Sequence, residues 1–137
     1  MNNITAKQAA DAIEEYVASI KGKNISIVRV TDFSTDPKEG INGKPDVVLL
    51  QRKWIGETTI GTCGCLYTTA LNYKGIINLD KYDGGGFYWF LPKIEGVEGF
   101  YGLSELTQCF DECTAEGFEE AAALVVSAIR ALDKAIS

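Results

Sequence analysis

The four cysteines form two pairs whose spacing could serve metal binding or thiol chemistry. Cys63 and Cys65 would point to one side of a strand, whereas Cys109 and Cys113 would point to one side of a helix. Two such pairs could supply the four sulfur ligands of a zinc site. Structural zinc sites prefer Cys-x-x-Cys turns, and neither pair has that spacing. We therefore expect free thiols without metal, with the zinc site and a disulfide as the alternatives.

The chain contains no histidine, which removes the imidazole base of Ser-His-Asp and Cys-His catalysis. The segment TCGCLYTTALNYKG, residues 62–75, resembles the segment that opens the C39-type cysteine peptidases, in which a Cys-Gly pair begins a helix that ends in Asn-Tyr-x-Gly. That family also needs a catalytic histidine, so the resemblance assigns no peptidase role here. We predict that the protein is not an enzyme and needs no cofactor.

Three consecutive glycines, Gly84 to Gly86, could form either a phosphate cradle or a tight turn. A phosphate loop needs a helix directly after its glycines, and the aromatic run that follows here, FYWFLP, is a poor helix start. The glycines lie between two strand-like runs, residues 76–82 and 87–92. This order favours a β-hairpin turn without a role in phosphate binding.

The charge of the chain is negative and unevenly distributed. The net charge is −6 and the pI is about 4.6, which argues against binding nucleic acid through its phosphates. Residues 94–120 include eight acidic residues and no lysine or arginine. This stretch is either an ordinary solvated face or a surface directed at a basic partner.

The hydrophobic pattern predicts a single domain over residues 1–137 that begins with a helix. Residues 5–21 carry apolar side chains at helical spacing, with Thr5 as the N-cap and Gly22 as a stop signal. β-Branched and aromatic runs predict strands after this helix. We expect strands at residues 25–30, 46–54, 76–82 and 87–92, a long loop at 31–45, and a strand rather than a helix at 58–73.

Two helices are expected at the end of the chain. The first covers residues 104–113 with Ser104 as its N-cap, and the second covers 115–136 with Thr114 as its N-cap. The second helix should bury one apolar stripe against the sheet. The predicted fold is a two-layer α+β domain, in which a mostly antiparallel β-meander is covered on one face by the N-terminal helix and the C-terminal helix pair. The stripe on this second helix comprises Phe118, Ala122, Val125, Ile129, Leu132 and Ile136.

These features favour a cytoplasmic, non-enzymatic binding protein that acts through an acidic and aromatic surface. Inhibitors, immunity proteins and phage-encoded antagonists are proteins of this type. The partner would be another protein, with a basic surface, or a second copy of the chain; neither a membrane nor nucleic acid is expected. The alternatives are a structural subunit of a multimer, such as phage tail or head completion, and a small-ligand pocket lined by Tyr67, Tyr88, Trp89 and Tyr101. The candidate binding residues are Tyr88, Trp89, Phe90, Tyr101, Glu95, Glu98 and Glu105.

Overall fold

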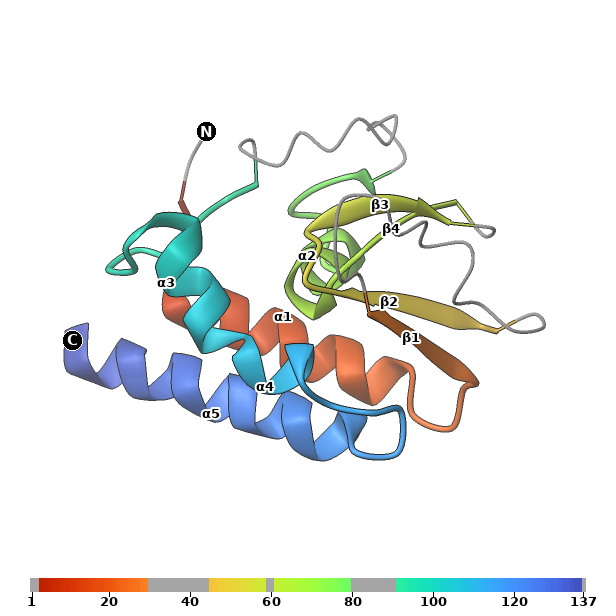
Figure 1. Ribbon diagram of the computed structural model, residues 1–137. Helices are drawn as coiled ribbons and strands as arrows, with labels where there is room; N and C mark the ends of the chain where they lie inside the picture. Colours follow the sequence, from red (N-terminus) through yellow and green to blue (C-terminus); the bar gives the residue numbers. More distant parts are fainter. Residues whose placement is uncertain (1–2, 30–44, 59–60, 80–90, 137) are drawn as a thin grey trace.

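The computed structural model describes residues 3–29, 45–58, 61–79 and 91–136, and it has an α+β architecture (Figure 1). In this part of the chain, one helix is followed by four short strands, and four helices follow the strands. The elements are α1 (Ala6–Ser19), β1 (Ile25–Arg29), β2 (Val47–Gln51), β3 (Ile55–Thr58), β4 (Gly61–Gly64), α2 (Leu66–Tyr73), α3 (Gly99–Leu106), α4 (Gln108–Asp111) and α5 (Phe118–Ile136).

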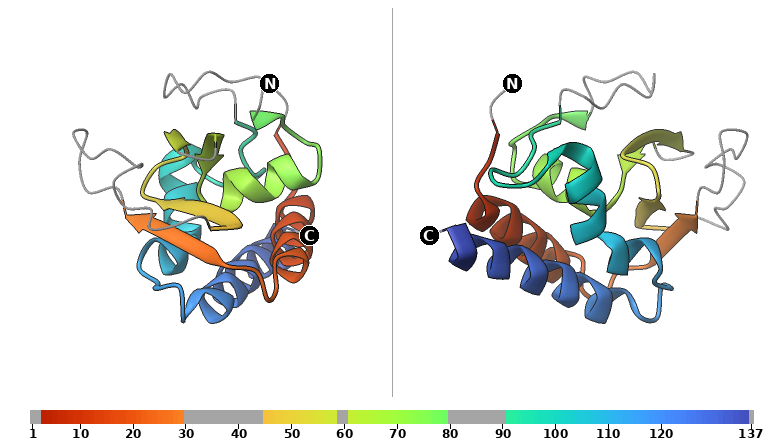
Figure 2. Two further views of the ribbon diagram at one scale, coloured as in Figure 1. Left: turned by 90° about the vertical axis from the view of Figure 1, so that its right-hand side faces the viewer. Right: turned by 60° about the vertical axis from the view of Figure 1, so that its left-hand side comes forward.

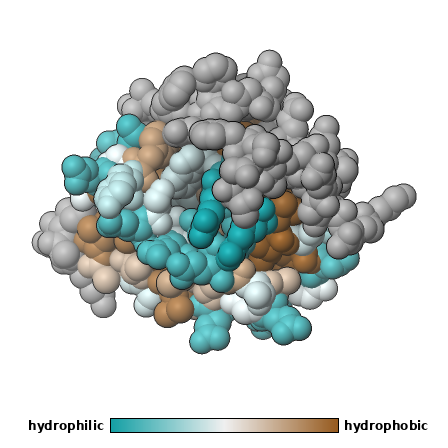
Figure 3. Space-filling model, viewed as in Figure 1, coloured by the Kyte–Doolittle hydropathy of each residue, from teal (hydrophilic) through white to brown (hydrophobic). Residues whose placement is uncertain are grey.

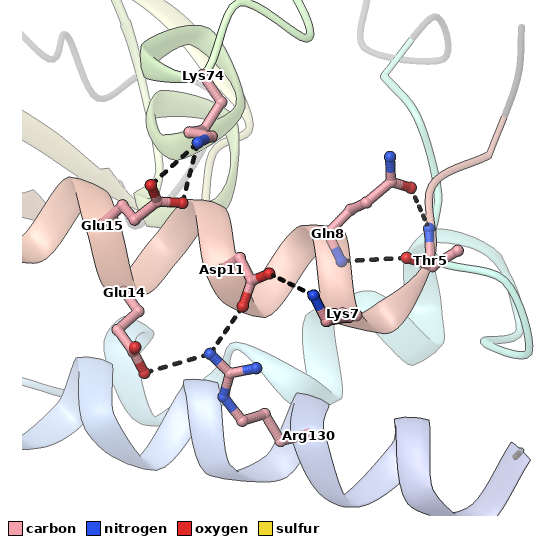
Figure 4. Close-up of polar contacts among 8 residues, drawn as sticks. All are labelled: Thr5, Lys7, Gln8, Asp11, Glu14, Glu15, Lys74 and Arg130. Atoms are coloured by element: carbon pink, nitrogen blue, oxygen red, sulfur yellow. Dashed lines mark hydrogen bonds and ion pairs between the residues drawn. The ribbon is translucent and has the colours of Figure 1, made fainter.

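Helix α1 begins and ends at the signals that the sequence predicts. The Thr5 hydroxyl accepts a hydrogen bond from the Gln8 backbone N–H at 3.1 Å, and the Gln8 side chain accepts one from the Thr5 N–H at 2.9 Å (Figure 4). This capping box satisfies two backbone donors that the helix leaves free. After the helix, Gly22 takes a φ of 86°, which glycine adopts without strain.

The four strands form two separate pairs rather than a meander. Strand β1 runs parallel to β2, with Ile25 opposite Val47, whereas β3 and β4 form an antiparallel pair. The predicted antiparallel meander is therefore wrong for β1 and β2. Parallel neighbours need a connection of about a dozen residues or more, and residues 30–46 provide one. Apolar alternation carries no information on strand direction.

The ambiguous segment 58–73 contains both of the structures that its sequence allows. Strand β4 ends at Gly64 and α2 begins at Leu66, so the prediction of a strand throughout is wrong. Gly64 allows this sharp change, because a Cβ at this position would collide with the Trp54 carbonyl oxygen and the Thr68 side chain. Residues 76–79, the described part of another predicted strand, are not a strand either. The glycine turn and the run 87–90 lie outside the described residues.

Helices α1 and α5 lie side by side in opposite directions (Figures 1 and 2). Phe118, Val125 and Ile129 are buried as predicted, and Leu132 is half-buried. Their main contacts are with α1, α3 and α4, so the expectation that α5 covers the sheet is wrong. An apolar stripe shows that one face of a helix is buried, but it does not show which other element of the chain packs against that face.

Ion pairs at the surface join α1 to its neighbours (Figure 4). Arg130 on α5 contacts Asp11 at 2.9 Å and Glu14 at 3.3 Å, and Lys74 contacts Glu15 at 2.9 Å. All of these side chains are substantially exposed, so each pair contributes at most about 1 kcal/mol to stability. The shared apolar core therefore dominates the packing of these helices.

The predicted helix 104–113 is divided into α3 and α4. Helix α3 already begins at Gly99, so Ser104 lies inside it and is not an N-cap. The division falls at Thr107, whose hydroxyl donates to the Leu103 carbonyl at 3.2 Å, a contact that often bends helices. Thr114 accepts a hydrogen bond from the Gly117 N–H at 3.4 Å, and α5 follows at Phe118. None of the helices in the described part of the chain has the length and hydropathy of a membrane-spanning segment.

Candidate functional site

The carboxyl ends of β1 and β2 are joined to α4 by a network of polar contacts. Gln51, with 2% of its surface exposed, donates from its amide nitrogen to the carbonyl oxygens of Phe110 and Cys113, both at 2.7 Å. Arg29, which is opposite Gln51 in the ladder, donates to the Asp111 carbonyl at 3.3 Å. The carboxyl edge of parallel strands is a common place for ligand sites.

Arg52, the residue directly after β2, has an unusual backbone conformation. Its φ is 66°, in the left-handed region that side chains other than glycine or asparagine rarely adopt. The Arg52 backbone N–H donates to the Asp111 carboxylate at 3.1 Å, which holds this turn against α4. Burial raises the pKa of the Asp111 carboxyl, while the hydrogen bond from Arg52 acts in the opposite direction. A strained backbone beside a partly desolvated carboxylate is typical of functional sites.

Two adjoining hollows open around this contact. The first, which we name the Cys65 hollow, has a volume of about 230 Å³, and the second, the Tyr101 hollow, has about 360 Å³. Three residues, Arg52, Ser104 and Asp111, line both hollows, so they are contiguous. The Cys65 hollow is also lined by Lys53, Trp54, Cys65 and Thr107, and the Tyr101 hollow by Tyr101, Glu105, Gln108 and Glu112.

The Tyr101 hollow brings together two of the predicted binding residues. Tyr101 has 76% of its surface exposed, and it lines the hollow together with Glu105. Glu98, the N-cap of α3, shares the helical face of Tyr101 but does not line the hollow, and Glu95 is exposed elsewhere on the same segment. Figure 3 shows hydrophilic residues gathered over the surface around α4. The predicted residues Tyr88, Trp89 and Phe90 lie outside the described residues.

Trp54 forms one wall of the Cys65 hollow. Its ring packs edge-on against Tyr67, with centroids 6.1 Å apart, and in a tilted arrangement against Phe100, with centroids 5.6 Å apart. Tyr67 is fully buried and donates its hydroxyl hydrogen to the Pro92 carbonyl. The prediction that Tyr67 and Tyr101 line one pocket is therefore wrong, because the Tyr67 ring lies in the core and the Tyr101 ring lies in solvent.

The four cysteines lie in four different environments. Cys63 is buried with Val28, Val48 and Leu50, and Cys65 is buried in the main core. Cys109 is exposed and Cys113 is half-buried. None of the four forms a disulfide, and no group of three or more metal-ligating side chains occurs within the described residues.

Cys65 is the N-cap of α2, the helix of the peptidase-like segment, but it is poorly suited to nucleophilic catalysis. Burial raises the pKa of its thiol, and the nearby Thr68 hydroxyl, 3.5 Å away, opposes this shift only in part. The thiolate is the reactive form, and the chain has no imidazole to generate it. Cys65 therefore contributes an apolar wall to its hollow.

A third hollow, of about 610 Å³, lies between α1 and α5 and has fewer unpaired polar groups for a ligand than the two hollows beside Arg52. Alanine and valine side chains form most of its lining, and its arginine, Arg130, is already bound to Asp11 and Glu14. Ligand sites usually combine an apolar cleft with convergent polar groups. We therefore place the candidate site at the two hollows beside Arg52.

No protein-family model, curated protein or solved structure matches this chain. The candidate site consequently rests on the chemistry of its own side chains. Sequence reasoning missed Gln51, Arg52 and Asp111. The available signal was the polar run Gln51 to Lys53, which interrupts an apolar strand at its carboxyl end.

Proposed function

We propose that the protein is a non-enzymatic binding protein whose Tyr101 hollow receives a lysine or arginine side chain of a partner protein. The observation that carries this proposal is the position of Tyr101, which is largely exposed beside the carboxylates of Glu105 and Glu112. An aromatic face attracts a cation, and carboxylates accept its hydrogen bonds. The three side chains together suit the cationic end of a lysine or an arginine.

The carboxylates of the hollow are available to a partner. Neither Glu105 nor Glu112 forms an ion pair within the described residues; Glu112 accepts a hydrogen bond from the neutral Gln108 at 3.0 Å. Residues 94–120 carry no basic side chain, and Arg52, from the turn after β2, also lines this hollow. A locally negative surface raises the rate at which basic partners associate.

Titration with a basic peptide tests this proposal. The probe is an acetylated and amidated Gly-Arg-Gly-Lys-Gly peptide, followed by the amide chemical shifts of the protein. We expect shifts centred on Tyr101, Glu105 and Glu112. The double change Glu105→Gln with Glu112→Gln should weaken binding about tenfold, equivalent to about 1.4 kcal/mol.

A matched variant separates the site from the net charge. Glu119→Gln with Glu120→Gln removes the same charge from exposed positions of α5. We expect this control to bind the peptide nearly as well as the unchanged protein. Equal weakening by both double variants would show that only the overall charge matters, and would overturn the proposed site. A role as a structural subunit gains no supporting observation from the described residues.

A further inference from the structure

We infer that the two hollows recognise one ligand group together, namely a lysine or arginine residue at the carboxyl terminus of a partner chain. This inference rests on the proposed function, because it places the cationic side chain of the ligand in the Tyr101 hollow. It adds that the terminal carboxylate lies in the Cys65 hollow, next to Arg52 and Lys53.

Arg52 and Lys53 are adjacent cations that line the same hollow. Within the described residues, neither side chain forms a hydrogen bond or an ion pair, although the charge of Arg52 is close enough to the Asp111 carboxylate to oppose the rise in its pKa. A guanidinium beside an ammonium is a favourable site for a carboxylate, and the guanidinium can bind both carboxylate oxygens. The exposed hydroxyl of Ser104 lies on the border and can donate a further hydrogen bond.

The backbone at Arg52 indicates that its side chain is needed at this position. A non-glycine residue in the left-handed region costs about 1–3 kcal/mol when the surroundings enforce it. Glycine or asparagine would form the same turn with less strain. The chain instead has arginine here, with φ at 66°, and the bond from its N–H to Asp111 stabilises that conformation.

The charges of the two hollows match the three polar groups of a terminal basic residue. Lys53 lines only the Cys65 hollow, Glu105 and Glu112 line only the Tyr101 hollow, and Arg52 lies on the border between them. Asp111 borders both hollows and can accept a hydrogen bond from the backbone N–H of the ligand residue. A lysine inside a chain lacks the terminal carboxylate and would leave the position beside Arg52 and Lys53 without this group.

Three short peptides test this inference by chemical-shift titration of the full chain. They are acetyl-Gly-Gly-Lys with a free carboxyl terminus, the same peptide amidated, and acetyl-Gly-Gly-norleucine with a free terminus. We expect the free-acid lysine peptide to bind at least about tenfold more tightly than either of the others. Lys53→Gln should reduce this preference without changing the affinity for the amidated peptide. We expect the same result from Arg52→Gln. Lys23→Gln, at an exposed position away from the site, should leave the preference unchanged.

The outcomes distinguish this inference from the proposed function. Equal binding of the free acid and the amide at the Tyr101 hollow would overturn the inference and leave the proposed function intact. Absence of shifts at Tyr101 with every lysine peptide would overturn both. If the norleucine peptide binds as tightly as the free-acid lysine peptide, the protein recognises only the terminal carboxylate, and the inference is overturned. Lys53→Gln keeps the test valid if the strained Arg52 position does not tolerate substitution.

Discussion

At the scale of single residues, the cysteines differ most in their access to solvent. Cys109 is exposed, whereas Cys63 and Cys65 are buried and burial raises the pKa of the Cys65 thiol. Because the thiolate is the reactive form, we expect Cys109 to react with a thiol reagent first and Cys63 and Cys65 to react only after unfolding. Thiol titration of native and denatured protein, with metal analysis, measures this. Stoichiometric zinc, or fewer than four reactive thiols in the denatured chain, would contradict it.

Asp111 and Asp11 should respond to pH with opposite signs. Burial raises the pKa of Asp111, so the folded state holds its proton more tightly than the unfolded state, and stability falls as pH rises from about 4 through the folded pKa. Asp111→Asn should remove this loss and should be at least as stable as the unchanged protein at pH 7. The hydrogen bond from Arg52 can be kept by the asparagine oxygen. The difference in stability between Asp111→Asn and the unchanged protein should disappear at acidic pH, where Asp111 is protonated in both the folded and the unfolded state.

Asp11 is the matched control for this measurement. The hydrogen bond from Arg130 lowers the pKa of Asp11, so its contribution to stability is present above the unfolded pKa and is lost as pH falls through the folded one. Asp11→Asn should therefore lower stability slightly at pH 7 and have no effect in acid. Urea unfolding from about pH 3 to pH 7 compares the two variants. A loss of stability at pH 7 from Asp111→Asn would show that its ionic contacts outweigh its burial.

At the scale of elements, α5 should be indispensable, because its inner stripe completes the core between α1, α3 and α4. Val125 has none of its surface exposed, and its neighbour Leu124 has 53% exposed. Val125→Asp would bury a charge without a partner, a cost that is large beside a typical net stability of about 5–15 kcal/mol. We expect this variant to be unfolded and Leu124→Asp to melt like the unchanged protein, both followed by circular dichroism. A native melt for Val125→Asp would show that the assigned inner face of α5 is wrong.

Elements with strong local signals could be predicted from the sequence, and those that depend on tertiary contacts could not. The capping residue Thr5 and the stop at Gly22 define α1 locally. In contrast, the division between β4 and α2 depends on the close approach of Gly64 to the Trp54 carbonyl oxygen, a contact that forms only when β3 and β4 pair. The parallel direction of β1 and β2 is likewise a long-range property. The hairpin at Gly84 to Gly86 lies outside the described residues and stays a prediction.

At the scale of the whole molecule, the candidate site combines residues from two distant parts of the chain. Tyr101 and Glu105 were predictable because an exposed acidic stretch is visible in the sequence. Arg52 and Asp111 were not, since only folding brings the turn after β2 against α4. The charge asymmetry of the chain could thus be predicted, but the cationic hollow beside the acidic one could not.

The acidic segment should also act at long range, through the rate at which a basic ligand arrives. Glu95 and Glu98 are exposed and do not line the Tyr101 hollow, so Glu95→Lys with Glu98→Lys should leave the melting temperature nearly unchanged. The double change should slow association of the Gly-Arg-Gly-Lys-Gly peptide several-fold at about 20 mM salt and much less at about 300 mM, where screening is strong. Its dissociation rate should stay the same, because no direct contact is lost.

Stopped-flow measurement of both rates checks this prediction, with Glu119→Lys and Glu120→Lys on α5 as the variant of equal charge change. A steering field near the site predicts a smaller effect from the α5 pair, because screening limits the reach of each charge to about 20 Å even at about 20 mM salt. Equal slowing by both pairs would assign the effect to net charge alone. A faster dissociation from Glu95→Lys with Glu98→Lys would instead place these two side chains in contact with the ligand, and the binding surface would then extend from the hollow toward the start of α3.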